Sequence, residues 1–295
     1  MAGRAEVVVA GIPPQQASQE MERAIAEVRR IEAKYSRYRA ESIVGRINAA
    51  AGISAVECDD ETWALMAHAD HLHVHSQGFF DITSGVLRRA WDFQGGRIPD
   101  QAEVQALLPL VGWDKVERSA QAVSLLHAGM EIDFGGIGKE YAADRAGALL
   151  MEHGVRHGYV NLAGDIRVMG PKPDGEPWVI GIQHPRATGA VLATLALSGG
   201  GIATSGDYER FFEVDGRRYC HLLNPFTGWP VDYWQCVSVQ APIATLAGNC
   251  CTIAMLMEEQ GREFLESTGL EFLAVDRHGT THVRGALHRP AADAR

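Results

Sequence analysis

The sequence predicts an α+β fold with mainly antiparallel sheets and flanking helices. Long patterns with apolar residues three and four positions apart indicate amphipathic helices. Short apolar runs broken by Gly, Pro and Asp-Gly indicate strands joined by tight turns. Helices and strands do not alternate as parallel βαβ units require. Because no repeat or linker divides the 295 residues, we expect one domain over 1–295, made of two closely packed halves.

The first half of the chain is expected to be mainly helical. A strand is predicted at 6–11, where the sequence reads EVVVAG. Asp59 or Asp60 is placed to cap one helix, and Gly154 is placed to end another. The amphipathic patterns predict helices over 15–38, 60–77 and 139–154.

The part of the chain after Gly154 changes to short strands. Asp215-Gly216 supplies the positive φ angles of a two-residue hairpin turn. A helix over 245–269 and a last strand over 270–279 complete the prediction. The strands themselves are expected at 158–170, 177–185, 190–199, 201–206, 210–224 and 235–242.

Composition and charge limit the classes of function. Hydrophobic residues make up 46% and charged residues 22% of the chain, as in an ordinary globular protein. A net charge of −10 argues against binding nucleic acid through the overall field, although one local site can still hold a phosphate. No apolar run approaches the ~20 residues of a membrane span, and the N-terminus lacks the layout of an export signal. We therefore expect no transmembrane segment. The missing export signal favours the cytoplasm, but the sequence leaves the compartment open.

Cysteine and histidine usage gives little support for a metal centre built from these residues. His68, His71 and His75 share a helix face, but no carboxylate lies in register with them, which favours a solvated face. The cysteines are odd in number and form no CxxC pair, which indicates buried thiols in a reducing compartment. They are Cys58, Cys220, Cys236, Cys250 and Cys251.

The glycine-rich segment 133–146, DFGGIGKEYAADRA, is the first candidate site. It brings Asp133, a Gly-Gly pair and Lys139 to the entry of a predicted helix. Glycines let a ligand approach the backbone, and a helix N-terminus offers free N–H groups with a positive dipole end. The segment is not a Walker loop, because GxxxxGK[ST] is absent. The alternative is a tight strand-to-helix turn without a ligand.

Three other places carry polar groups. Thr204-Ser205-Gly206 can donate hydroxyl and backbone hydrogen bonds to a phosphate, although such a triplet is also a common turn. Asp81 either contacts a ligand or only caps the helix that follows it. His221, in RRYCHLLNPFTGWP, is either a core histidine bonded to backbone or an imidazole that meets a ligand at the rim of the turn.

Six segments fall in the order of the motifs of a known family. They are similar to the motifs of the FAD:protein FMN transferases, the ApbE-type flavinyltransferases, and the resemblance runs from Met1 to about Met257. It implies a flavin cleft between the two halves, Mg²⁺ against the FAD pyrophosphate, and attack by a protein hydroxyl that releases AMP. The segments are SRYRAESIVGRIN, GFFDITSGVLRRAWDF, DFGGIGKEYAADRA, NLAGDIRVMG, IATSGDYERFFEVDGRRYCHLLNPFTGWPV and TLAGNCCTIAML.

The resemblance also implies roles for single residues. His221 matches the histidine that assists the chemistry, and the Gly136 carbonyl and Thr252 match metal-binding positions. A neutral imidazole near pH 7 can take the proton of an incoming hydroxyl, and a hard cation neutralises phosphate oxygens. The positions matching flavin or adenine contacts are Met1, Tyr38, Phe79, Phe80, Asp81, Asp133, Lys139 and Leu222.

The sequence departs from the family at the metal site. The family's last motif reads Ala-Asp-x-x-x-Thr, with the aspartate as a metal ligand, and Gly248 stands at that aspartate position. Asn224 likewise stands where an aspartate is common. Both changes remove negative charge, so we expect weakened Mg²⁺ binding, and tighter binding after Gly248→Asp.

The expected function is transfer of FMN from FAD to a threonine or serine of an acceptor protein, assisted by a metal. One alternative is a protein that binds FAD without transferring it. Another is an FAD pyrophosphatase, in which water replaces the hydroxyl and FMN and AMP are released. The expected partners are therefore FAD and an acceptor flavoprotein subunit.

Overall fold

A computed structural model describes residues 3–285 and residue 287. Its centre is a seven-stranded sheet in the order β1-β5-β6-β9-β12-β13-β14, in which every neighbouring pair is antiparallel. The α+β prediction with mainly antiparallel sheets is confirmed. The strands are β1 (Ala5–Ala10), β5 (His157–Leu162), β6 (Asp165–Gly170), β9 (Gly200–Gly206), β12 (Trp234–Ala241), β13 (Glu271–Asp276) and β14 (Thr281–Arg284).

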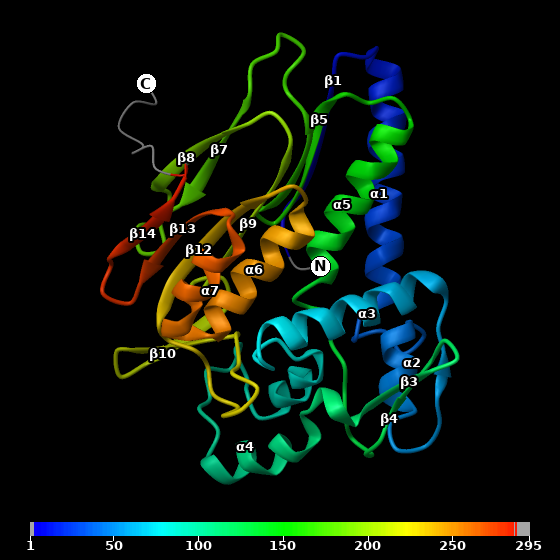
Figure 1. Cartoon of the computed structure of the whole chain (residues 1–295), viewed down its shortest axis with the longest axis vertical. Coiled ribbons are helices and arrows are strands. Elements are labelled where there is room, and N and C mark those ends of the chain that lie inside the picture. Colours follow the sequence, from blue (N-terminus) through cyan, green and yellow to red (C-terminus); the bar gives the residue numbers. More distant parts are fainter. Residues whose placement is uncertain (1–2, 286, 288–295) are drawn as a thin grey trace.

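Helices cover one face of this sheet, and a β-hairpin covers the other (Figure 1). α6 packs on β9 and β12, and α5 lies between α6 and α1. On the opposite face, apolar residues of the β7–β8 hairpin pack against the sheet. The elements are α1 (Pro14–Tyr35), α5 (Gly138–Glu152), α6 (Ala244–Leu256), α7 (Gly261–Thr268), β7 (Trp178–Gln183) and β8 (Val191–Leu197).

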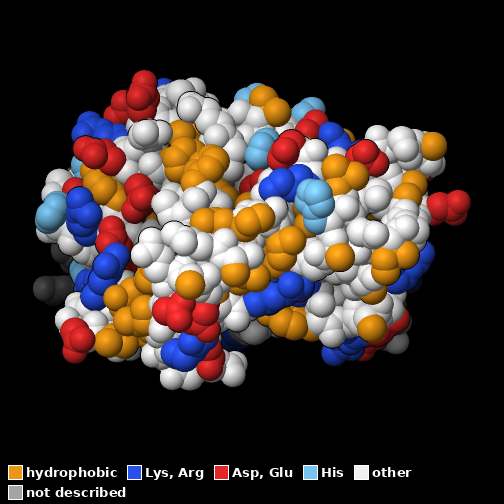
Figure 2. Space-filling view, turned by 90° about the horizontal axis from the view of Figure 1, so that it is seen from below, with side chains coloured by type: hydrophobic (Ala, Val, Ile, Leu, Met, Phe, Trp, Pro, Cys, Tyr) orange, Lys and Arg blue, Asp and Glu red, His pale blue; other side chains and the backbone are white. Residues whose placement is uncertain are grey.

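The lower part of Figure 1 is a helical region with a small sheet of its own. Strands pair in the order β2-β4-β3, and their apolar residues join a core that continues to α1 and α5. Its elements are α2 (Ile43–Ala49), α3 (Asp60–His75), α4 (Gln101–Leu107), β2 (Val56–Glu57), β3 (Val116–Ser119) and β4 (Ala122–Leu125), with 3-10 turns at Ile82–Arg89, Leu108–Leu110 and Trp113–Lys115. Seen from below, this face mixes apolar, acidic and basic side chains (Figure 2).

Local signals predicted several boundaries correctly. Asp59 caps α3, since its Oδ1 accepts a hydrogen bond from Thr62 N at 2.9 Å. β10 (Phe211–Val214) and β11 (Arg217–Cys220) form the predicted hairpin. Its turn residues Asp215 and Gly216 have φ angles of 51° and 77°. All five cysteines are free and buried, as expected.

The helix predicted over 245–269 is interrupted. α6 ends at Leu256, a 3-10 turn covers Glu258–Gln260, and α7 then begins at Gly261. Glu258 adopts a φ of 51°, and its carbonyl accepts a hydrogen bond from Trp234 Nε1 on β12 at 2.6 Å. A contact with the sheet thus stabilises the interruption between α6 and α7. Helix propensity, which depends on neighbouring residues, does not predict such a contact.

A search of the described helices finds none that is both long and apolar enough to cross a membrane.

Candidate active site

The loop before α5 holds Asp133 in place by several contacts. Asp133 Oδ1 accepts a hydrogen bond from Gly135 N at 2.9 Å, which tightens the loop. Arg88 Nη1 lies 2.7 Å from Asp133 Oδ2, and Arg37 Nε lies 3.8 Å from the same oxygen. The sequence analysis did not single out these two arginines. Each is marked in the sequence only by another arginine close to it. A carboxylate and two guanidinium groups therefore stand beside the entry to α5.

The N-terminus of α5 has the open form expected of an anion site. Its N-cap residue is Ile137, which has no side-chain acceptor for the amides of the first turn. Phe80 packs against the loop so closely that a Cβ on Gly136 would lie 3.1 Å from its ring. The glycine is therefore needed for packing. The Gly138 amide is already bonded to Phe134 O at 2.7 Å, so the first turn offers a phosphate mainly its positive dipole end.

The Gly136 carbonyl is tied to α6. Asn249 Nδ2 donates a hydrogen bond to Gly136 O at 3.0 Å, and Asn249 Oδ1 lies 2.8 Å from His68 Nε2. His71 and His75 are exposed, as expected for a solvated helix face. This expectation does not hold for His68, which is half-buried and whose imidazole meets Asn249 of α6.

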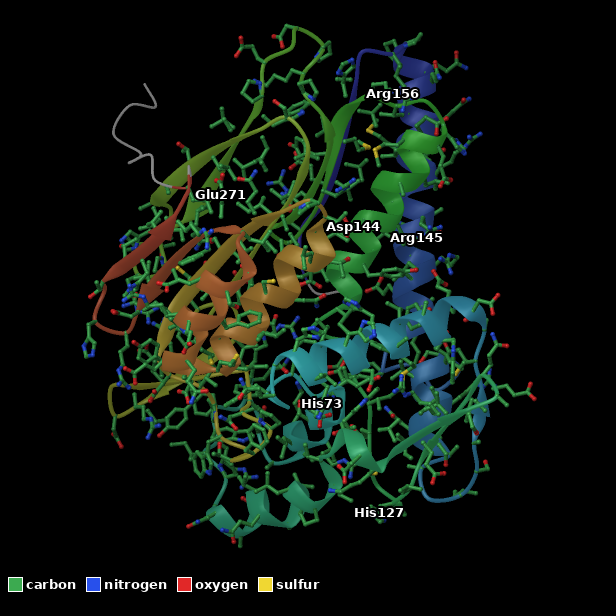
Figure 3. All side chains as sticks on the ribbon, viewed as in Figure 1. His73, His127, Asp144, Arg145, Arg156 and Glu271 are labelled. Carbon is green, nitrogen blue, oxygen red and sulfur yellow. The ribbon has the colours of Figure 1, made fainter. Side chains whose placement is uncertain are left out.

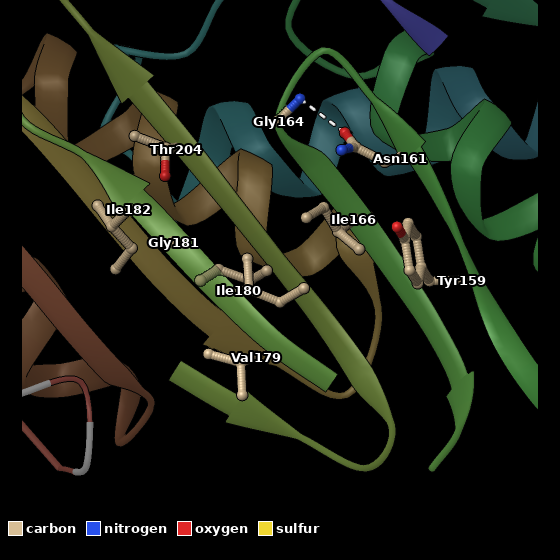
Figure 4. A pocket seen from close by; sticks show the side chains of 10 residues that line it. Tyr159, Asn161, Gly164, Ile166, Val179, Ile180, Gly181, Ile182 and Thr204 are labelled. Carbon is tan, nitrogen blue, oxygen red and sulfur yellow. Dashed lines mark hydrogen bonds between the residues drawn. The ribbon is translucent and has the colours of Figure 1, made fainter. Parts of the chain in front are cut away.

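Thr252 and Ser205 meet between α6 and β9. Their hydroxyl oxygens are 3.4 Å apart, and Thr252 is buried. Thr204 Oγ1 instead bonds Ser238 Oγ at 2.7 Å, on the other face of the sheet. There Thr204 lines a hollow of about 230 Å³ beneath the β7–β8 hairpin (Figure 4). Successive side chains of a strand point to opposite faces, so the two neighbouring hydroxyls cannot serve one ligand together.

Gly206 is the last residue of the same strand, and the Tyr208 ring lies where its side chain would be. A Cβ at Gly206 would come within 2.4 Å of Tyr208 Cε1. The glycine is thus explained by packing in this structure.

Lys139 is held by a buried aspartate that the sequence reading missed. Lys139 Nζ lies 2.6 Å from Asp165 Oδ2, and the Asp165 side chain is 2% exposed. Burial alone would lower the pKa of Lys139, but the carboxylates of Asp165 and Glu140 outweigh it and raise the pKa. The ammonium is therefore fully charged at neutral pH at the start of α5.

Glu140, the next residue, is a buried carboxyl group. It is 5% exposed, and its buried Oε2 has no hydrogen-bond donor within residues 3–285 and 287. Burial and the nearby Asp165 carboxylate raise the pKa of Glu140 to about 8.

Glu140 also fills the space at Gly248 on α6. A Cβ built on Gly248 would lie 2.5 Å from Glu140 Cγ and 2.9 Å from Cδ. The expectation that Gly248→Asp alone tightens Mg²⁺ binding is corrected by this contact, since the Glu140 side chain occupies the place of the new one.

Asp144 fixes α6 relative to α5. It points from α5 toward the start of α6 (Figure 3). Its carboxylate accepts hydrogen bonds from Ala244 N at 2.9 Å, Thr245 N at 2.8 Å and Thr245 Oγ1 at 2.6 Å. A residue of one helix thus caps the other, which sets the position of Gly248 and Thr252 against α5.

His221 has the environment of a neutral imidazole with a free nitrogen. Its backbone N donates to Arg210 O at 3.0 Å, and its buried side-chain Nδ1 has no hydrogen-bond partner in the described part of the chain. Burial, followed by the charges of Arg88, Arg210 and Lys139, lowers the pKa of His221 to about 4. The charge of Arg88, which also pairs with Asp133, thus acts on the pKa of His221.

Asp81 uses both oxygens within the protein. Its Oδ1 accepts from Thr83 N at 2.8 Å and from Thr83 Oγ1 at 2.6 Å, and its Oδ2 accepts from Trp113 N at 3.0 Å. It is the cap of the 3-10 turn Ile82–Arg89, which is the structural alternative considered for it.

The remaining predicted contacts lie around this region at different depths. Tyr38 is 78% exposed and stacks on Arg37, with 4.9 Å between the guanidinium carbon and the ring centroid. Phe79 packs on Phe226 at a centroid distance of 5.0 Å and lines a second surface hollow of about 550 Å³. Leu222 is half-buried in the core, and Met1 lies outside the described residues.

Asn224 belongs to the turn after His221. Its Oδ1 accepts hydrogen bonds from Phe226 N at 2.9 Å and Thr227 N at 3.2 Å. This corrects the expectation that Asn224 removes negative charge from a metal pocket, because its side chain closes the turn.

The donor set near Gly136 suits a hard cation. Within residues 3–285 and 287, no group of three or more His, Cys, Asp or Glu side chains gathers as a metal site. The oxygens of this region are instead of mixed type: the Gly136 carbonyl bonded to Asn249, the Thr252 hydroxyl on α6 and the Glu140 carboxyl group against Gly248. Such oxygen ligands fit Mg²⁺.

Known proteins resemble this chain along most of its length. The model of the ApbE family matches residues 1–274. A protein of Klebsiella pneumoniae named FAD:protein FMN transferase is 35% identical over 66% of this chain and 61% of its own length. A protein of the same name from Haemophilus influenzae is 28% identical over 84% of this chain and 75% of its own. This chain thus spans somewhat under two thirds of the first relative and about three quarters of the second.

Solved structures agree with the sequence comparisons. The ApbE protein of Thermotoga maritima superposes with a TM-score of 0.87 at 33% identity, covering 95% of this chain and 93% of its own. The flavinyl transferase ApbE of Pseudomonas stutzeri gives a TM-score of 0.83 at 30% identity, covering 95% and 90%. The predicted membership in this class of transferase enzymes is confirmed, and the chain belongs to the ApbE family.

Proposed function

We propose that the protein transfers the FMN moiety of FAD to a threonine or serine hydroxyl of an acceptor protein, with residues 1–295 acting as one flavinyltransferase domain. The observation that carries the proposal is the ammonium of Lys139, which the buried Asp165 holds at the start of α5. In support, Thr252, which pairs with Ser205, lies beside the neighbouring Gly136, and the charge of Lys139 contributes to the lowered pKa of His221. The names of the relatives support the same donor and the same kind of acceptor.

The reaction is a displacement at phosphorus. The acceptor oxygen forms a bond to the phosphorus on the FMN side, and the bond from that phosphorus to the bridging oxygen breaks, so that AMP leaves with the bridging oxygen. The hydroxyl proton passes to a base. Positioning and neutralisation of charge supply most of the rate in such a transfer.

The residues of this chain would divide these tasks. Lys139 and the positive dipole end of α5 bind and orient the phosphates. The His221 imidazole, neutral with Nδ1 free, accepts the proton or donates a hydrogen bond to a phosphate oxygen. The Gly136 carbonyl and Thr252 would hold a divalent cation, which supplies charge neutralisation on the phosphate oxygens.

A transfer assay tests the proposal and separates it from the two alternatives. The protein is incubated with FAD, Mg²⁺ and candidate flavoprotein subunits, and the denatured acceptor is examined for flavin fluorescence. Transfer gives a fluorescent acceptor band together with AMP in equal amount. Free FMN with AMP indicates a pyrophosphatase, and bound FAD without AMP indicates a binding protein; either result refutes transfer.

A further inference from the structure

Glu140 is a buried carboxyl group on α5. Its side chain is 5% exposed, and no donor among the described residues bonds to its Oε2. The neighbouring ammonium of Lys139 pairs with Asp165 Oδ2, at 2.6 Å. An unpaired carboxylate oxygen is costly to bury, so it calls for a proton or a cation at that point.

The position of Glu140 relative to α6 is specific. The missing side chain of Gly248 leaves a notch, and Glu140 Cγ, Cδ and Oε1 lie 2.5, 2.9 and 2.9 Å from where a Cβ at Gly248 would be. The carboxyl group of α5 therefore lies where a short side chain from position 248 would project. A bulkier residue at 248 could not coexist with Glu140 in this conformation.

Two other oxygens belong to the same region. Thr252 follows Gly248 by four residues, so both lie on one face of α6. The Gly136 carbonyl is held beside that helix by its 3.0 Å hydrogen bond from Asn249 Nδ2. Carbonyl, hydroxyl and carboxylate oxygens are the ligands that Mg²⁺ and Mn²⁺ prefer.

We propose that Glu140 supplies the carboxylate ligand of the divalent cation, in place of the side chain that Gly248 lacks, so that α5 rather than α6 carries the negative charge of the metal site. This inference rests on the proposed function, because the cation would serve the FAD pyrophosphate. The competing account is a proton shared between Glu140 and Asp165, since the Asp165 carboxyl lies within hydrogen-bonding reach. The two accounts differ in whether Glu140 is needed for metal binding.

Direct binding of Mn²⁺ decides between them. Free Mn²⁺ is measured by electron paramagnetic resonance during titration of the full chain, with and without FAD. Glu140→Gln keeps the size of the side chain and its ability to hydrogen-bond Asp165, and thermal unfolding without metal verifies that it folds. Glu152→Gln, an exposed position on the same helix, is the matched control.

We expect Glu140→Gln to lose at least tenfold in Mn²⁺ affinity and Glu152→Gln to match the wild type. The double variant Glu140→Ala with Gly248→Asp moves the carboxylate to α6, and it should bind Mn²⁺ more tightly than Glu140→Ala alone. Glu140→Gln binding within twofold of the wild type overturns the inference, as does a double variant no better than Glu140→Ala.

The metal inference and the transfer proposal fail in different ways. Mn²⁺ binding that depends on Glu140, in a protein that forms no flavinylated acceptor, supports the metal inference and refutes transfer. Flavinylation with Mg²⁺, together with unchanged Mn²⁺ affinity in Glu140→Gln, supports transfer and refutes the inference.

Discussion

The close approach of Glu140 to Gly248 can be tested by stability alone. Gly248→Ala adds a Cβ that would lie 2.5 Å from Glu140 Cγ. That atom belongs to the middle of a buried side chain, so it cannot swing into solvent as the end of an exposed one could. Overpacking of this kind costs about 1–3 kcal/mol, whereas replacing a glycine inside a helix by alanine gains about 0.5–1 kcal/mol.

We expect Gly248→Ala to destabilise the wild-type chain and to stabilise a Glu140→Ala variant. In the wild-type chain, Gly248→Ala should lower the free energy of unfolding by up to about 2.5 kcal/mol, the overpacking cost less the helical gain. In a Glu140→Ala background the obstacle is gone, and the same change should raise it by about 0.5–1 kcal/mol. The coupling between the two sites is therefore about 1–3 kcal/mol.

Urea unfolding of the four proteins in this cycle gives the coupling directly, provided that the slope of the transition is unchanged. Gly138→Ala is a useful control, because a Cβ there meets only Phe134 Cβ at 3.9 Å, an ordinary contact. Equal effects of Gly248→Ala in both backgrounds would show that Glu140 does not occupy the notch. The reasoning about the metal site would then lose its geometric basis.

Four further predictions concern Lys139, His221 and Asp144. Lys139→Met should weaken FAD binding at least tenfold, because the positive charge beside the α5 amides is lost. Lys139→Arg keeps that charge and should retain more of the FAD affinity. Unchanged affinity in a flavin fluorescence titration would contradict the placement of Lys139 near the phosphates. Because the pKa of His221 is lowered to about 4 from 6.5, its imidazole stays neutral in the free enzyme, and kcat/KM should show no histidine limb near pH 6.5. As the pH falls, His221 binds a proton in the unfolded chain before it does so in the folded protein. It therefore lowers the free energy of unfolding progressively from about pH 6.5 to pH 4. His221→Gln should remove this loss in unfolding measured as a function of pH. Asp144→Ala removes the cap of α6 and should cost about 1–2 kcal/mol in urea unfolding, and a cost near zero would show that the inter-helix cap is unimportant.

Elements with strong local signals were predictable from the sequence. The Asp59 cap, the Asp215-Gly216 turn and the apolar periodicity of α5 act over a few residues, so neighbouring positions contain the necessary information. The region between α3 and α5 contains short helices and 3-10 turns, whose patterns are too brief to be read locally. The break between α6 and α7 depends on a contact with Trp234, which no local pattern includes.

The sequence by itself determined the family, the antiparallel α+β class and the segments that carry the candidate site, because ordered motifs, periodicity and turn residues are properties of neighbouring positions. Only the tertiary structure decided how these segments meet. It paired Lys139 with Asp165, and it separated the hydroxyls of Thr204 and Ser205 onto opposite faces of β9. It also brought Glu140 to Gly248, 108 positions along the chain (248 less 140). Contacts between distant helices follow from how the layers pack, and a missing carboxylate at one position can therefore be compensated from another helix.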